Sequence, residues 1–98
     1  MPRALWTPQA RADLKQLAKY IAKEGQRPIV AERLVDEIRS KCDEYAARPD
    51  IGARHPQLPE ELRVFVHSRY VVVYEPGVDG MTVLRIVDGA RDFARLFR

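Results

Sequence analysis

The hydrophobic period of this chain changes once, and that change constrains its fold more than any other feature. Up to about Tyr45, apolar residues recur three and four positions apart, which is the spacing of one face of an α-helix. From Leu62 onward they alternate or cluster in short runs rich in Val, Ile, Tyr and Phe, as is typical of β-strands. The sequence therefore predicts an α+β domain in which helices precede most of the sheet.

The first helix has clear start and stop signals. Leu5 and Trp6 are expected to form a short first strand. Thr7 then stands as an N-cap before Pro8, whose missing N–H is harmless at the first helical position. Gly25 supplies the stop. Between them, one apolar stripe is formed by Ala10, Leu14, Leu17, Ala18 and Ile21.

A second helix is expected to follow almost at once, because Pro28 can open it and Pro49 forbids its continuation. Its apolar stripe consists of Ala31, Leu34, Val35, Ile38, Cys42 and Tyr45. Two helices joined by a few residues form an antiparallel αα-hairpin. Neither stripe can be buried by the other alone, so the hairpin must pack on the sheet.

The second half of the chain predicts a meander. Residues 50–61 form a loop, and strands are expected at 62–67, 70–75 and 81–88. Tight turns at Ser68-Arg69 and at residues 76–80 make the three strands antiparallel neighbours. A short turn or helix is expected at 91–98.

The turn at Ser68-Arg69 predicts a register that gives the sheet two unequal faces. It pairs His67 with Tyr70, Phe65 with Val72 and Arg63 with Tyr74, and the second turn sets Tyr74 beside Val83, Val72 beside Arg85 and Tyr70 beside Val87. The face expected to receive the helices carries Leu62, Val64, Val66, Val71, Val73, Leu84 and Ile86. The face predicted to be functional carries Arg63, Phe65, His67, Tyr70, Val72, Tyr74, Val83, Arg85 and Val87. A register slip of one residue would exchange the two faces.

Composition narrows the class of protein. The 98 residues suffice for a single domain over 1–98, which is expected to be modestly stable alone and to gain from a bound partner. A net charge of +3 permits an acidic partner or nucleic acid without requiring one. The single cysteine excludes an internal disulfide, and no apolar run reaches the ~20 residues of a membrane span. The N-terminus has no signal-peptide core, so the protein is expected in the cytoplasm.

Few residues suggest chemistry, and no cofactor or metal is expected. His55 and His67 lack metal-ligand spacing, and Cys42 falls on the buried stripe of the second helix. The one reaction the functional face could support is metal-free RNA cleavage. Arg63 and Arg85 would then bind phosphate, Tyr70 or Tyr74 would stack a base, and His67 would move a proton. The alternative is that both arginines only pair with Glu75, Asp88 or Asp92 and that His67 is an ordinary exposed residue beside a turn.

The order and spacing of short motifs along nearly the whole chain resemble the RelE/ParE superfamily of bacterial type II toxins, and the ParE branch most of all. The matching residues are Trp6-Thr7-Pro8 with Ala12 and Leu14, Arg48-Pro49 with Ile51-Gly52, Leu62-Arg63, Tyr70-Val71-Val72-Val73-Tyr74, Leu84-Arg85-Ile86-Val87 and Gly89-Ala90-Arg91-Asp92. The resemblance implies a β-α-α-β-β-β fold and a toxin neutralised by a cognate antitoxin.

The resemblance also bears on activity. Ribonuclease members carry His, Tyr, Lys or Glu in and after the last strand, where this chain has Asp88, Phe93 and Phe97. That departure favours the ParE activity, a non-enzymatic inhibition of DNA gyrase. Asp88 also stands where the ParE motif commonly has histidine. The alternatives are a RelE-type ribosome-dependent ribonuclease, using Arg63, Arg85, His67 and Tyr70, and a degenerate toxin that acts only as an antitoxin-binding co-repressor.

The expected partners follow from the same resemblance. They are a ribbon-helix-helix antitoxin in a hetero-oligomer with the toxin, DNA gyrase, and operator DNA reached only through the antitoxin. An amphipathic antitoxin helix, with or without an added strand, would lie across apolar residues of the hairpin and sheet. The residues expected to bind antitoxin or target are Arg63, Tyr74, Arg85, Arg91, Phe93, Leu96 and Phe97. The alternative for the three apolar residues of the tail is packing on their own core.

Overall fold

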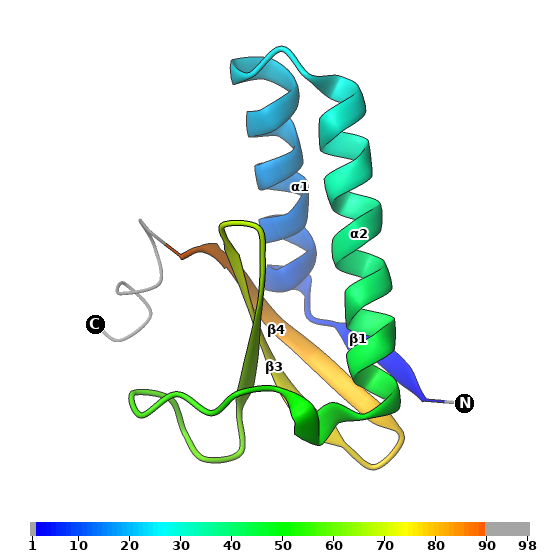
Figure 1. The fold of residues 1–98 in the computed structure, drawn as a ribbon, viewed down its shortest axis with the longest axis vertical. Helices are drawn as coiled ribbons and strands as arrows, with labels where there is room; N and C mark the ends of the chain where they lie inside the picture. Colours follow the sequence, from blue (N-terminus) through cyan, green and yellow to red (C-terminus); the bar gives the residue numbers. More distant parts are fainter. Residues whose placement is uncertain (1, 90–98) are drawn as a thin grey trace.

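A computed structural model describes residues 2–89 of the protein (Figure 1). Its elements are β1 (Arg3–Trp6), α1 (Pro8–Glu24), α2 (Pro28–Ala47), the 3₁₀ helix η1 (Pro49–Ile51), β2 (Arg63–His67), β3 (Tyr70–Gly77) and β4 (Gly80–Asp88). This order confirms the predicted β-α-α-β-β-β layout. The turn or helix expected at 91–98 lies outside the described residues. No helix within 2–89 is both long and apolar enough to cross a bilayer.

The predicted helix boundaries are confirmed, and the N-cap residue of α1 also connects this helix to β4. The Thr7 hydroxyl accepts a hydrogen bond from the Ala10 N–H at 3.0 Å and donates one to the Leu84 carbonyl at 3.1 Å. Gly25 caps the end of α1, and Pro28 occupies the first turn of α2. The N-cap of α1 therefore also fixes the start of this helix against β4.

The four strands form one sheet in the order β1-β4-β3-β2. The predicted antiparallel meander is present, and β1 adds to it as a parallel neighbour of β4, with Arg3 opposite Gly80 and Trp6 opposite Val83. The first and last strands of the described chain are thus hydrogen-bonded to each other. Figure 1 shows the α1–α2 hairpin rising from the sheet, with β1 at the edge.

The register between β2 and β3 is as predicted, whereas the register between β3 and β4 is correct only in part. Tyr74 does lie opposite Val83, but beyond that pair Leu84 is an extra residue that makes a bulge. In consequence Val72 faces Ile86 and not Arg85, and Tyr70 faces Asp88 and not Val87. The alternation of side chains along β4 is broken there, so Val83 and Ile86 both point into the same core.

The predicted assignment of the sheet faces is wrong for β2, β3 and Val83, whereas Ile86, beyond the bulge, does face the helices as predicted. The helices cover the face that was expected to be functional, and the main core includes Phe65, Tyr70, Val72, Tyr74, Val83 and Ile86. The opposite face holds a smaller cluster of Val64, Val71, Val73 and Val87, partly covered by Leu58 and Leu62. The aromatic rings fill the space beneath the hairpin, where Tyr45 stacks on Phe65 with ring centroids 4.2 Å apart. The polar residues Arg63, His67 and Arg85 lie where strands meet other elements and do not mark an open face.

Candidate functional site

Arg85 is bound to a carboxylate on α1. Its Nε donates to Asp13 Oδ2 at 2.8 Å and its Nη2 reaches Asp13 Oδ1 at 3.4 Å. The backbone N–H of Ile86 donates to the same Oδ2 at 3.0 Å. The Asp13 side chain is only 11% exposed, whereas that of Arg85 is 39% exposed. The arginine is therefore anchored from one side, and part of its surface remains open to an anionic partner.

Of the alternative partners predicted for Arg85, Glu75 and Asp88 are wrong. Glu75 and Asp88 were expected to pair with Arg63 or Arg85, yet Asp88 pairs with Arg69 at 2.6 Å. Asp92 lies outside the described residues. Sequence reasoning missed Asp13 because it stands 72 positions from Arg85, and no local spacing connects the two.

Arg63 holds the short helix η1 against the sheet. Its Nη1 donates to the carbonyl oxygens of Asp50 at 2.9 Å and Gly52 at 3.0 Å. Beside it, the Tyr74 hydroxyl donates to the Pro49 carbonyl at 2.6 Å, and the tyrosine side chain is fully buried. Burial raises the pKa of the Tyr74 hydroxyl above its ordinary value. Tyr74 is thus a buried core residue of this structure, and its direct contact with antitoxin or target stays a prediction.

Gly52 is expected to be intolerant of any side chain. A Cβ at this position would overlap the Tyr74 hydroxyl and ring, so Gly52→Ala should destabilise the fold by about 1–3 kcal/mol. Tyr74→Phe alone should cost about 1 kcal/mol through its lost hydrogen bond. Urea unfolding of both single variants and the double variant checks this contact. The double variant should lose less stability than the two single variants lose in total. Strictly additive losses of unfolding free energy would contradict the predicted overlap.

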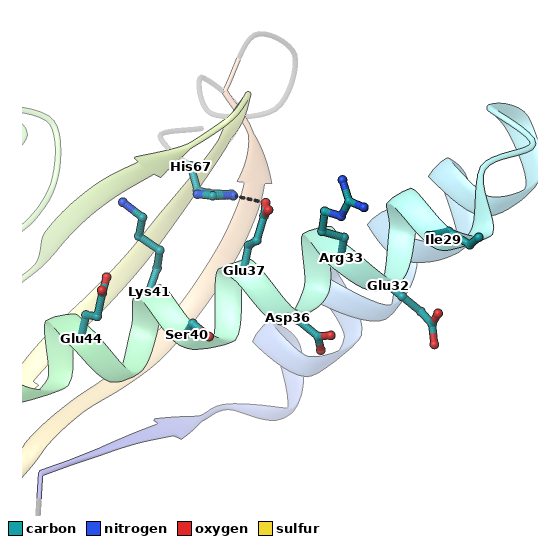
Figure 2. A pocket seen from close by; sticks show the side chains of 9 residues that line it. All are labelled: Ile29, Glu32, Arg33, Asp36, Glu37, Ser40, Lys41, Glu44 and His67. Atoms are coloured by element: carbon teal, nitrogen blue, oxygen red, sulfur yellow. Dashed lines mark hydrogen bonds and ion pairs between the residues drawn. The ribbon is translucent and has the colours of Figure 1, made fainter.

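His67 connects the end of β2 to α2. Its Nε2 lies 2.9 Å from Glu37 Oε1, and its side chain is 18% exposed. Figure 2 shows Glu37 pointing toward His67, whereas Glu32 and Asp36 on the same helix point away. The hollow beside this pair is lined almost entirely by polar and charged side chains of α2. His67 is thus a partly buried contact of Glu37 and not the freely exposed residue of the simpler prediction.

The remaining reactive groups are buried. Tyr70 is 7% exposed, and burial raises the pKa of its hydroxyl. Cys42 is completely buried, which raises the pKa of its thiol to about 12 and removes it as a nucleophile at neutral pH. Within residues 2–89, no side-chain hydrogen bond or ion pair joins any two of the four residues proposed for RNA cleavage. The described residues contain no cluster of His, Cys, Asp and Glu suited to a metal ion.

The four tail residues predicted to bind a partner, Arg91, Phe93, Leu96 and Phe97, lie outside the described residues. A surface that sequence reasoning missed lies between the two helices. Two adjoining hollows there share Lys15, Ala18 and Val35, and together they form what we term the hairpin groove. The hairpin groove is lined by Trp6, Arg11, Leu14, Lys15, Ala18, Lys19, Ala22, Pro28, Ala31, Glu32, Val35, Asp36 and Arg39. The four-residue spacing of its basic side chains on α1 is the signal that could have found it.

Comparison with known proteins places the fold. The family model described as "ParE toxin of type II toxin-antitoxin system, parDE" matches residues 4–93. "Toxin RelE3" of Caulobacter vibrioides is 34% identical over 80 residues, which cover 81% of this chain and 85% of that protein. A solved structure described as "Chromosomal ParDE TA system from P. aeruginosa" aligns with a TM-score of 0.70 at 22% identity, covering 90% of this chain and 96% of that one. This last likeness concerns the fold. The match over nearly the whole chain shows that the protein belongs to the ParE toxin family of type II toxin–antitoxin systems, within the RelE/ParE superfamily.

Proposed function

We propose that this toxin stops growth by inhibiting DNA gyrase as a binding protein, without catalysing a reaction of its own. The observation that carries this proposal is that the side chains a ribonuclease would need for catalysis are already bound to other parts of the chain. Arg63 is bound to carbonyls around η1, His67 is bound to Glu37, and Arg85 is bound to Asp13. Each of these contacts joins the sheet to another element, so the three side chains serve the fold.

The same contacts argue against proton transfer. A general base must reach the proton that it removes, directly or through one water. His67 directs Nε2 at a carboxylate, and Tyr70 is buried with its pKa raised. The His67 side chain is only 18% exposed and Tyr70 is 7% exposed, so neither side chain reaches freely toward a 2′-hydroxyl of RNA. A surface that binds and obstructs another protein needs no such group.

Neutralisation by an antitoxin belongs to the same proposal. The chain would form a hetero-oligomer with a ParD-like antitoxin, whose ribbon-helix-helix domain would carry the operator DNA binding. The similar solved structure is that of a ParDE system, and the family description names parDE, which supports a partner of this kind. Arg85 remains available to acidic antitoxin side chains because more than a third of its side chain is exposed.

A gyrase assay tests the proposal. Purified toxin added to gyrase, ATP and relaxed plasmid should block supercoiling or accumulate cleaved plasmid at micromolar concentration. Heat-denatured toxin provides the control for nonspecific effects. Supercoiling that proceeds at the same rate with and without folded toxin would contradict gyrase as the target. Expression of the toxin without its antitoxin in a sensitive host distinguishes an active toxin from a degenerate one, because only a degenerate toxin would leave growth unimpaired.

A RelE-type ribonuclease is the second candidate, and the name of the Caulobacter relative, Toxin RelE3, favours keeping it. This candidate predicts cleavage of message in a translation extract that depends on ribosomes. Cleavage should be lost in Arg85→Ala and retained in Arg54→Ala, which alters an exposed arginine of the loop before β2. Intact message at toxin concentrations that inhibit gyrase would exclude this candidate.

A further inference from the structure

Three arginines from separate parts of the chain line one hollow, which we term the arginine pocket. Arg27 precedes α2, Arg33 belongs to α2, and Arg69 lies in the turn between β2 and β3. Figure 2 shows Arg33 on the same side of α2 as Glu37. The pocket has a volume of about 510 Å³, within the range of about 300–1,000 Å³ that is typical of small-molecule sites. None of the residues that line it belongs to the hairpin groove.

The guanidinium groups of this pocket are open to an anion. Arg27 and Arg33 are exposed, and within residues 2–89 their side chains make no hydrogen bond or ion pair. The Arg69 side chain pairs with Asp88 at 2.6 Å and is still 52% exposed. Among the described residues that line the pocket, Glu37 has the only carboxylate. The lining therefore carries an excess of positive charge.

Below these cations the pocket is apolar. Ile21 of α1 and Leu34 of α2 line it together with Tyr70 at the start of β3. Leu34 and Tyr70 are buried, whereas Val30, at the mouth, is 43% exposed. Apolar area that is still in contact with water stabilises a complex when a ligand covers it. The pocket thus fits a molecule with an apolar body and an anionic end.

Two further polar groups line the pocket and are available to a ligand. Ser68 has φ at +57°, a left-handed conformation in which asparagine or glycine is the usual residue of a two-residue turn. Its hydroxyl makes no hydrogen bond within residues 2–89 and can donate one to an anion. Glu37 uses Oε1 for His67, and within the same residues its Oε2 has no partner. This second oxygen can accept a hydrogen bond from an amino group.

We propose that the arginine pocket binds a nucleotide, with its phosphate monoester between the three guanidinium groups and its nucleobase against the apolar side chains. A phosphate monoester carries about −1.5 to −2 charges at neutral pH, which matches three arginines offset by one glutamate. A carboxylate ligand carries only one charge and would leave part of that excess. Each arginine can donate two parallel hydrogen bonds to a phosphate.

The remaining groups set the kind of base and the way in which the phosphate is held. Adenine, cytosine and guanine carry an exocyclic amino group that can donate to Glu37 Oε2, whereas uracil and thymine do not. The chain has no glycine-rich phosphate loop. Side chains, and not a row of backbone amides, therefore hold the phosphate in this pocket.

Binding of adenosine 5′-monophosphate to the full chain tests the proposal by isothermal titration calorimetry. We expect a Kd below about 1 mM. Adenosine, which lacks the phosphate, should bind at least about tenfold more weakly because it leaves the arginines without an anion. Inorganic phosphate should also bind at least about tenfold more weakly, because it covers none of the apolar side chains.

A pair of double variants locates the binding. Arg27→Ala combined with Arg33→Ala should weaken adenosine 5′-monophosphate at least about tenfold. The matched control, Arg48→Ala combined with Arg54→Ala, removes the same charge at two exposed arginines outside the pocket. It should bind within about threefold of the unmodified chain, since exposed charges beyond a Debye length are largely screened. Circular dichroism should show both variants folded.

Three results would overturn the proposal. These are equal binding of adenosine and adenosine 5′-monophosphate, no binding of the monophosphate at about 10 mM, and equal weakening in the two double variants. The titrations contain no gyrase, so their outcome does not depend on the proposed target.

A terminal phosphate monoester occurs both on free nucleotides and at the end of a nucleic-acid strand. A single-stranded tetranucleotide with a 5′-phosphate, compared with the same strand without it, distinguishes these sources. Tighter binding of the phosphorylated strand than of adenosine 5′-monophosphate assigns the pocket to strand ends, and weaker binding assigns it to free nucleotides. Equal binding of the two strands, lost in the Arg27→Ala and Arg33→Ala variant, would overturn the proposal in favour of a surface for backbone phosphates.

Discussion

Replacing Gly80 with alanine is expected to lower the free energy of unfolding by about 2–6 kcal/mol, the sum of backbone strain and overpacking. Gly80 begins β4 with φ at +130°, a conformation that side chains rarely adopt. A Cβ there would also overlap the backbone of Arg3, with the Arg3 nitrogen 2.6 Å away. Because that neighbour is backbone and not a flexible side-chain end, β1 must move away from β4 to relieve the overlap.

Gly77 provides the matched control, since it lies in the same hairpin and pairs with Gly80. A Cβ at Gly77 would come no nearer than 3.7 Å to another atom, so Gly77→Ala should change stability by less than about 1 kcal/mol. Urea unfolding followed by circular dichroism measures both. Similar midpoints for the two variants would contradict the close approach of β1 to Gly80 together with the strained backbone there, because these two features distinguish Gly80 from Gly77.

Asp13→Ala is expected to have the second large effect, a loss of about 2–4 kcal/mol, because it removes three hydrogen bonds that involve a charged group. The carboxylate receives the Arg85 guanidinium and the Ile86 N–H, and the bulge of β4 at Leu84 presents both of them. Without the carboxylate, α1 keeps the Thr7 contact to Leu84 but loses its second attachment to the strand.

The control for this prediction is Asp43→Ala, which removes an exposed carboxylate of α2. Its effect should stay within about 0.5 kcal/mol, as is usual for surface substitutions. The loss of stability in Asp13→Asn should fall between those of Asp13→Ala and Asp43→Ala, since the amide oxygen can still accept a hydrogen bond but carries no charge. Equal unfolding midpoints for Asp13→Ala and Asp43→Ala would show that the Arg85 attachment does not stabilise the fold.

The parts of the fold that the sequence predicts well are those marked by local chemistry. Thr7, Pro8, Gly25 and Pro28 set the helix boundaries because capping and proline geometry act within one turn. Ser68, with φ at +57°, lies in the short turn that fixes the β2–β3 register. Each of these features depends only on residues a few positions away.

The features that sequence reasoning missed depend on distant parts of the chain. No period indicates that β1 pairs with β4, since parallel neighbours need not be close in sequence. The bulge at Leu84 changes which side chains of β4 share a face, and nothing in the surrounding Val, Ile and Leu residues marks it. The assignment of the two faces failed because large aromatic rings, and not the more purely aliphatic set, pack beneath the hairpin.

The candidate site also has one part that the sequence predicts and another part that depends on distant residues. Arg63 and Arg85 stand out in the sequence by their place among apolar residues, and both prove to be anchored to other elements. Their partners, carbonyls near η1 and the carboxylate of Asp13, could not be predicted without the tertiary fold. The hairpin groove required the structure as well, because its two walls belong to different helices, although the four-residue spacing of the cations on α1 is visible in the sequence.

We propose that this toxin inhibits gyrase and does not cleave RNA. One measurement tests that claim directly: a single toxin preparation titrated in parallel into a gyrase supercoiling reaction and into a ribosome-containing translation extract with labelled message. We expect loss of supercoiling or accumulation of cleaved plasmid at micromolar toxin, with the message intact over the same range. Message cleaved at ribosomes while supercoiling proceeds unchanged would contradict the claim.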